Sequence, residues 1–167
     1  GDSLTCGFHH GGSAFQPYGH ALRSCLQSLG MDASVGIVGL SGLTAAELVA
    51  KQRSRQIFDV CGKSNRGLTC VLEESKGWDL VVLMVGTNDI GEGSAAHDTM
   101  RAVAELHQVC HQRNIPTVAL AAPYPSAYAH RRDAFNTLLQ SWVEKQPLCT
   151  HYIDPEQLLP RQEMERN

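Results

Sequence analysis

The sequence lacks the features of a membrane-spanning or signal segment. Six apolar residues in a row, at positions 80–85, fall far short of the roughly 20 that a spanning helix needs. The first residues do not form the basic and then apolar pattern of a signal peptide. No block of like charge stands out, and a formal net charge of −3 provides no long-range attraction for nucleic acid or an anionic membrane. We therefore expect no membrane span and no nucleic-acid partner.

The six cysteines include no Cys-x-x-Cys pair, which argues against a structural zinc site or a thioredoxin-like redox centre. Most of them fall in apolar helical or strand patterns, which favours reduced, half-buried thiols. The alternative is one disulfide between Cys61 and Cys70, which flank a loop rich in glycine, serine and asparagine. The cysteines therefore leave the cellular compartment undecided.

The length and composition predict one domain. A chain of 167 residues, 43% of them apolar, is long enough for a single domain with its own core, which we expect over residues 1–167. The sequence begins on Gly1 rather than on methionine, and we expect it to be a segment of a longer protein. It predicts no oligomeric state.

An apolar run in the middle of the chain indicates a buried strand. Leu80 to Val85, bounded by Asp79 and Gly86, is typical of a strand that is covered on both faces. Further strands are expected at 34–38, 116–121 and 150–153, and helices at 17–30, 44–58, 68–74, 95–113 and 131–145. Strands and helices that alternate with short connections predict a three-layer α/β/α domain with a parallel sheet.

Three polar turns are expected at one edge of this sheet, and each supplies a different group. Ser3 lies in the first turn, Gly42 follows the strand expected at 34–38, and Asn88 follows the central strand. A serine hydroxyl is a weak nucleophile until a base takes its proton, and the oxyanion formed on an ester carbonyl needs donors already in place. The backbone N–H groups of Ser3 and Gly42 and the side-chain NH₂ of Asn88 are three such donors. Thr44-Ala-Ala-Glu47 reads as a capping box that starts a helix after Gly42.

These turns resemble a known family. Gly1-Asp2-Ser3-Leu4-Thr5, Gly39-Leu40-Ser41-Gly42 and Gly86-Thr87-Asn88-Asp89 look like the first three sequence blocks of the SGNH (GDSL) hydrolase superfamily, in the family's order and spacing. Residues 122–125, 135–138 and 152–154 resemble the family more loosely. The likeness covers essentially the whole chain.

The resemblance implies a flavodoxin-like α/β/α fold and the hydrolysis of acyl esters with no metal or cofactor. Ser3 would be the nucleophile and one oxyanion donor, and Gly42 and Asn88 would be the other donors. Asp2 and Asp89 also belong to the motifs, and we interpret them as turn formers that orient their neighbours by hydrogen bonds.

The sequence departs from the family pattern at both ends. The family's fourth block, an Asp-x-x-His after the last strand, has no match, because the third residue after Asp154 is Gln157. The strand that precedes Gly-Asp-Ser in the family is also missing. We therefore expect a domain clipped at both ends. This segment alone should be nearly inactive, because losing a triad base can reduce turnover by about 10⁶.

Several of these residues also have simpler interpretations. Ser3 alone could be a turn serine, and asparagine often caps a helix, although the next helix is expected only near residue 95. His9 and His10 suggest metal ligands or a substitute base, but a glycine-rich surface loop is the simpler interpretation because no third ligand is suitably spaced. Other histidines are expected to be packed or solvated on the long helix (His97, His107, His111), at a helix start (His130) or in the last strand (His151).

The sequence supports two functions from different classes. The first is an esterase that hydrolyses a small-molecule ester through an acyl-enzyme on Ser3. The second is a catalytically inactive binding module with the same fold. A nucleotide-binding protein is disfavoured because no phosphate-binding loop of the form G-x-x-x-x-G-K-[ST] occurs. Acetylated sugars, short-chain esters and lysophospholipids all remain open as substrates.

Overall fold

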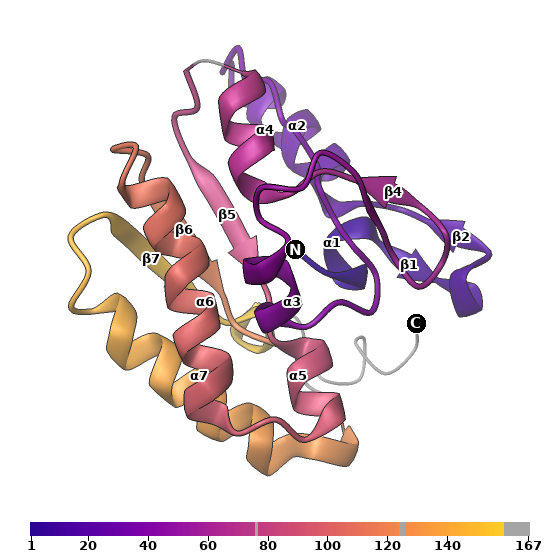
Figure 1. Cartoon of the computed structure of the whole chain (residues 1–167). Helices are drawn as coiled ribbons and strands as arrows, with labels where there is room; N and C mark the ends of the chain where they lie inside the picture. Colours follow the sequence, from indigo (N-terminus) through magenta and orange to yellow (C-terminus); the bar gives the residue numbers. More distant parts are fainter. Residues whose placement is uncertain (76, 124–125, 159–167) are drawn as a thin grey trace.

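The computed structural model describes residues 1–75, 77–123 and 126–158, and its centre is a parallel sheet (Figure 1). Three strands, β5 (Val81–Met84), β6 (Thr117–Leu120) and β7 (Cys149–Ile153), lie in the order β5-β6-β7. The register pairs Met84 with Leu120 and Leu120 with Ile153. The fold is α/β/α with a parallel sheet, as the alternation of strands and helices predicted.

Two long helices cover the sheet. Helix α6 (Ala96–His111) packs against α7 (Ala129–Val143), and α7 also packs against β7. Buried residues on α6 recur at helical spacing (Thr99, Met100, Val103, Leu106, His107, Val109 and Cys110). On α7, Phe135 and Leu139 are almost completely buried. The long periodic segments of the sequence therefore form the core, close to the predicted bounds.

The amino-terminal part of the chain consists of shorter elements, many of them exposed. It contains helices α1 (Ser3–Cys6), α2 (Tyr18–Ser28), α3 (Ala45–Ala50) and α4 (Leu68–Glu74), and the antiparallel pairs β1 (Phe8–His9) with β2 (Ala14–Phe15) and β3 (Ile57–Phe58) with β4 (Ser64–Asn65). A short 3₁₀ turn at His10–Gly12 also lies in this part, and two others lie later in the chain, at Ser126–Tyr128 and Pro155–Gln157. Only Gly19 of α2 is buried. In the part of the chain that the structure describes, no helix is both long and apolar enough to cross a bilayer.

The strand expected at 34–38 is not present. Backbone hydrogen bonds join this segment only to Gly1, whose amino group donates to the Val38 oxygen (3.0 Å) and whose oxygen accepts from the Leu40 N–H (3.0 Å). A strand requires a ladder of several hydrogen-bonded residue pairs, and here Gly1 alone provides both bonds. The apolar pattern of this segment predicted full burial, but Val35 and Ile37 are only half-buried, beside α2.

The region between Thr44 and Gly67 also differs from the prediction. The capping box is confirmed, because Glu47 N–H donates to the Thr44 hydroxyl and Thr44 N–H donates to the Glu47 carboxylate. The helix ends at Ala50 instead of continuing to residue 58. Residues 51–56 are all polar, so a longer helix would have no apolar face to bury. The chain forms the β3–β4 hairpin instead, across the loop expected at 61–67.

A short helix that the sequence did not predict, α5 (Thr87–Glu92), directly follows β5, which is an edge strand of the described sheet and is only half-buried at Val81 and Val82. Gly86 begins it and Gly93 ends it, both with positive φ. Six residues are too few to display a helical period, which explains the omission. The six cysteines are free thiols, so the alternative of a Cys61–Cys70 disulfide is wrong. Tyr124 and Pro125 of the block at 122–125 lie outside the described residues.

Candidate active site

Ser3 is the first residue of α1 and is half-buried. Asp2 caps this helix, because its fully buried carboxylate accepts the Leu4 N–H at 3.0 Å. Burial raises the pKa of the Asp2 carboxyl, while the N-terminal ammonium, the Leu4 N–H and the Thr87 hydroxyl act in the opposite direction. Asp2 therefore fixes the turn that carries Ser3, in agreement with its interpretation as a turn former.

The Ser3 turn packs closely against the turn that contains Gly42. A Cβ atom at Gly39 would lie 2.4 Å from the Cys6 sulfur and 2.8 Å from the Asp2 carbonyl oxygen, so only glycine allows this approach. The bonds of Gly1 on either side of Gly39 hold the same contact. The first and second sequence blocks are thus neighbours in space.

Gly42 itself requires glycine for two reasons. Its φ is +78°, which side chains rarely adopt, and a Cβ there would lie 2.5 Å from a methyl carbon of Val60. Ser41, which precedes it, is almost completely buried. The Gly42 turn is therefore enclosed by the Ser3 turn on one side and the β3–β4 hairpin on the other.

Asn88 and Asp89 join the third block to the second. The Asn88 side-chain NH₂ donates to the Leu43 oxygen at 2.8 Å, and the Ala45 N–H donates to the Asp89 carboxylate at 2.9 Å. Burial raises the pKa of the Asp89 carboxyl, while the Ala45 N–H lowers it. Asn88 lies inside α5, so the prediction that no helix begins before residue 95 is wrong. Its side chain nevertheless binds the Gly42 loop rather than its own helix.

These contacts bring the three sequence blocks to the carboxyl end of β5. Ligands of open parallel sheets bind beyond the carboxyl ends of the strands, so the edge is chemically well placed. The three blocks carry a serine hydroxyl, a main-chain turn at glycine and a carboxamide, and a Cβ at Gly1 would lie 2.8 Å from the Met84 oxygen at the end of β5. An NH₂ group has two donors, and the bond to Leu43 uses one of them.

Comparison with known proteins identifies the family. The profile of the GDSL-like Lipase/Acylhydrolase family matches residues 1–166. The chain belongs to this family. Its members are hydrolases by description, and the resemblance of the three blocks is confirmed. Among proteins with curated descriptions, none matches the sequence.

Solved structures of the same fold include several esterases. AlinE4, described as an SGNH-hydrolase family esterase, has a TM-score of 0.72 at 20% identity, over 98% of this chain and 78% of that chain. TesA has a TM-score of 0.67 at 23% identity, over 87% and 71%. The psychrotrophic esterase EstA from Pseudoalteromonas sp. has a TM-score of 0.66 at 15% identity, over 92% and 73%. At these identities the likeness establishes the shared fold of this family member.

None of the eight histidines of this family member, all within the described residues, hydrogen-bonds Ser3. His107 and His111 instead converge on the Thr117 hydroxyl, at 2.7 and 2.9 Å, between α6 and β6. Burial lowers the pKa of His107 to about 3. The rings of His9 and His10 lie 4.7 Å apart, and no group of three metal-binding side chains occurs among the described residues.

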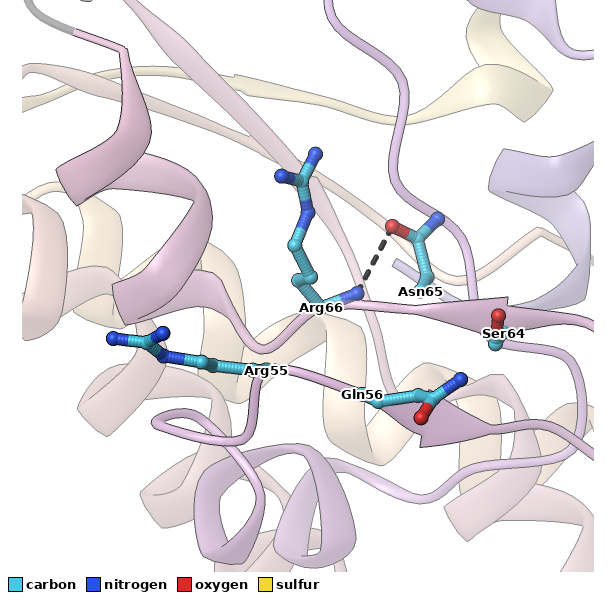
Figure 2. Close-up of a pocket in the computed structure, with 5 residues that line it drawn as sticks. All are labelled: Arg55, Gln56, Ser64, Asn65 and Arg66. Carbon is cyan, nitrogen blue, oxygen red and sulfur yellow. Dashed lines mark hydrogen bonds between the residues drawn. The ribbon is translucent and has the colours of Figure 1, made fainter.

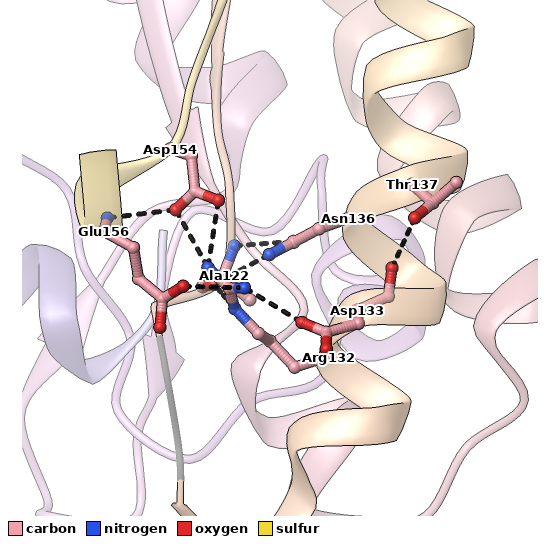
Figure 3. Close-up of polar contacts among 7 residues, drawn as sticks. All are labelled: Ala122, Arg132, Asp133, Asn136, Thr137, Asp154 and Glu156. Carbon is pink, nitrogen blue, oxygen red and sulfur yellow. Dashed lines mark hydrogen bonds and ion pairs between the residues drawn. The ribbon is translucent and has the colours of Figure 1, made fainter. Parts of the chain in front are cut away.

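Asp154, which follows the last strand, takes part in a buried ion pair and not in a pair with His151. Both oxygens of its carboxylate accept from the Arg132 guanidinium, at 2.9 and 3.0 Å, and Arg132 also contacts Asp133 and Glu156 (Figure 3). Arg132 Nε donates to the Ala122 oxygen at 3.0 Å. This cluster ties the turns after β6 and β7 to α7. The sequence offered one signal for it, an arginine within the apolar pattern of a helix.

A shallow hollow of about 500 Å³ lies away from the three blocks, at the base of the β3–β4 hairpin (Figure 2). Polar side chains line it (Arg55, Gln56, Ser64, Asn65 and Arg66). Arg66 also forms an ion pair with Glu74. No residue of this hollow was predicted as a site residue.

Proposed function

We propose that this chain is a serine ester hydrolase that becomes acylated on Ser3. The observation that carries the proposal is the 2.8 Å hydrogen bond from the Asn88 side chain to the Leu43 oxygen, which joins the turn after β5 to the Gly42 turn. The two backbone bonds of Gly1 to the segment that leads into that turn support the same arrangement from the Ser3 side. The substrate is a small carboxylic ester.

In this proposal the Ser3 hydroxyl attacks the ester carbonyl carbon, and the alcohol leaves from the tetrahedral intermediate. The Ser3 N–H, the Gly42 N–H and the second Asn88 N–H stabilise the oxyanion. Water then releases the acid from the acyl-enzyme. Donors that are fixed before the substrate arrives need no reorganisation during the reaction, and the bond that holds Asn88 supports such a fixed position.

Removal of the proton from the Ser3 hydroxyl is the slow step that we expect in this chain. No histidine is hydrogen-bonded to Ser3 among the described residues, and in this proposal a base from solvent can take the proton of the Ser3 hydroxyl. Loss of a triad base can cost about 10⁶ in turnover, whereas loss of one oxyanion donor costs about 10²–10³. We therefore expect slow acylation by the chain alone and faster acylation when a soluble base is supplied.

The test is covalent labelling by a fluorophosphonate, with and without added imidazole, followed by mass spectrometry of the intact protein and its peptides. We expect one adduct, on Ser3, formed at least about tenfold faster with imidazole, because imidazole replaces the base. Ser3→Ala should abolish the adduct. Ser24→Ala, at an exposed position of α2, is the matched control and should label normally.

The result that contradicts the proposal is an unlabelled Ser3 in folded protein at high imidazole concentration. That result would favour the alternative of an inactive binding module with the same fold. An adduct on another residue would mean that the nucleophile is wrongly assigned.

A further inference from the structure

Asp59 is a buried carboxylate that the reaction above does not use. It begins the tip of the β3–β4 hairpin, residues 59–63, and only 7% of it is exposed. One carboxylate oxygen accepts the N–H groups of Cys61 (2.9 Å) and Lys63 (2.8 Å), and the other accepts the Ser41 N–H (3.1 Å). A buried carboxylate is costly unless hydrogen bonds satisfy both oxygens, and here both are satisfied.

The hairpin tip forms hydrogen bonds to both the N–H and the carbonyl oxygen of Ser41. Asp59 holds the Ser41 N–H, and the next residue, Val60, donates its own N–H to the Ser41 oxygen at 3.2 Å. The Ser41 carbonyl and the Gly42 N–H belong to one planar peptide unit. A bond that fixes this carbonyl therefore also fixes the direction of the Gly42 N–H. It also polarises the same unit, which strengthens that N–H as a donor.

Packing reinforces the hydrogen bonds at this point. Val60 is 75% exposed, yet two of its methyl carbons lie within 2.7 Å of the place where a Gly42 Cβ would be. The tip thus lies directly beside Gly42, whose φ is +78°. Ser41 is almost completely buried beneath it, so solvent does not compete for these bonds.

We propose that Asp59 is a positioning residue that, through the 59–63 tip, aims the Gly42 N–H at the oxyanion. This inference rests on the function proposed above. It extends that function to a buried carboxylate that lies outside the three sequence blocks and that hydrogen-bonds backbone groups of the protein.

Asp59→Asn tests this role without removing volume. The carboxamide keeps one accepting oxygen, which satisfies the larger number of donors when it faces Cys61 and Lys63. Its NH₂ group then faces the Ser41 N–H, and two donors cannot bond. The variant should keep the hairpin and release the Ser41 side of the contact.

The readout is the fluorophosphonate reaction at Ser3 in imidazole, separated into the inhibitor affinity and the maximal labelling rate. We expect Asp59→Asn to lower the maximal rate about 10- to 100-fold with affinity within about twofold, because the oxyanion forms only in the transition state. Asp32→Asn, at an exposed carboxylate, is the matched control and should change neither. A general loss of packing would instead weaken affinity and lower the melting temperature.

A second variant keeps the test decisive if Asp59→Asn does not fold. Replacing Val60 with its α-hydroxy acid turns the 59–60 amide into an ester, which removes the N–H that binds the Ser41 oxygen and also weakens the Asp59 carbonyl that accepts the Gly62 N–H at 3.0 Å. We expect a smaller fall of the maximal rate, about threefold, since one neutral hydrogen bond is lost. Unchanged maximal rates in the folded variants would overturn the role of Asp59 alone. An unlabelled parent protein would overturn the proposed function and this inference together.

Discussion

The two parts of the chain differ in how much of the shared apolar core they supply and in how their turns are held. From β5 to β7, long helices cover a parallel sheet, and apolar side chains such as Val103, Phe135 and Leu139 form a continuous core. From α1 to α4, most elements are shorter; Leu40, Leu43 and Leu48 join the same core, and the carboxylates of Asp2 and Asp59 accept backbone N–H groups and so fix the turns. The sheet region therefore supplies most of the apolar core, and the amino-terminal region supplies the Ser3 and Gly42 turns of the candidate site.

This difference has a consequence for function. Ser3 and Gly42 lie in the region with less apolar packing, and Asn88 and Asp89 reach across from the sheet to hold it. Polar contacts are directional, so they set the orientation of an N–H group better than apolar contacts do. Changes in the sheet region should mainly alter stability, and changes in the amino-terminal turns should mainly alter reactivity.

The largest effect should come from acid, through His107 in the core of the sheet region. Its imidazole stays neutral in the folded protein because burial lowers its pKa to about 3, whereas the unfolded chain binds a proton below about pH 6.5. The free energy of unfolding should therefore fall as the pH drops from 6.5 toward 3, by about 1.4 kcal/mol per unit, or nearly 5 kcal/mol in all. Urea denaturation across this range measures the slope.

The slope should be smaller in His107→Gln, which has no proton to bind. His97→Gln, at an exposed position on the same helix, should keep the slope of the parent. Identical slopes in all three proteins would show that His107 is protonated in the folded state.

Core packing should give the next largest effect. Phe135→Ala removes a fully buried ring that lies next to Gly86, and we expect a loss of about 4 kcal/mol in the free energy of unfolding. Leu29→Ala, at a residue that is 71% exposed after α2, should cost less than about 0.5 kcal/mol. Comparable losses in urea denaturation would remove the contrast between the two regions.

The Arg132 cluster tests whether polar contacts also stabilise the sheet region. Arg132→Met leaves the Asp154 carboxylate buried without its guanidinium, and we expect a loss of about 3 kcal/mol, since breaking a buried pair costs roughly 3–5 kcal/mol. Arg101→Met removes a pair with Asp98 whose side chains are well exposed, so it should cost less than about 1 kcal/mol. A loss for Arg132→Met no greater than that of the control would mean that Asp154 is solvated.

The smallest effect is expected at the capping box of α3. Thr44→Ala removes the acceptor of the Glu47 N–H and should cost about 1 kcal/mol by the same measurement. Thr137→Ala, on the exposed side of α7, is the control and should stay within about 0.5 kcal/mol. Because Thr44 follows Leu43 directly, an added fall in Ser3 labelling would indicate that the cap also holds the site.

The sequence predicted the sheet region better than the amino-terminal region, for the same physical reason. Burial against a core leaves a period in the sequence, so the strands at β5 and β6 and the helices α6 and α7 were predicted within about two residues. The amino-terminal helices α2 and α4 were predicted as closely, but the turns and hairpins between them were not. Turns that are held by hydrogen bonds produce no such periodic pattern in the sequence. The β3–β4 hairpin, α5 and the buried, hydrogen-bonded position of Asp59 were therefore missed, and residues 34–38 were wrongly expected to form a strand.

The site residues were predicted from motif spacing rather than from periodicity. The third block follows β5, where a ligand of a parallel sheet is expected, whereas the second block follows a segment that forms no strand. What spacing cannot reveal is which side chain holds which turn. The bonds of Asn88 to Leu43 and of Asp89 to Ala45 depend on three-dimensional packing between residues more than 40 positions apart.

The most direct test of the account is a crystal structure of the protein with a phosphonyl group on Ser3. EstA, which shares the fold, has been solved in a form inhibited by monoethylphosphonate. We expect one phosphonyl oxygen to lie within about 2.7–3.1 Å of three donors, the N–H groups of Ser3 and Gly42 and the side-chain nitrogen of Asn88. A phosphonyl oxygen that faces solvent, with the Gly42 N–H and Asn88 turned away from it, would contradict the account.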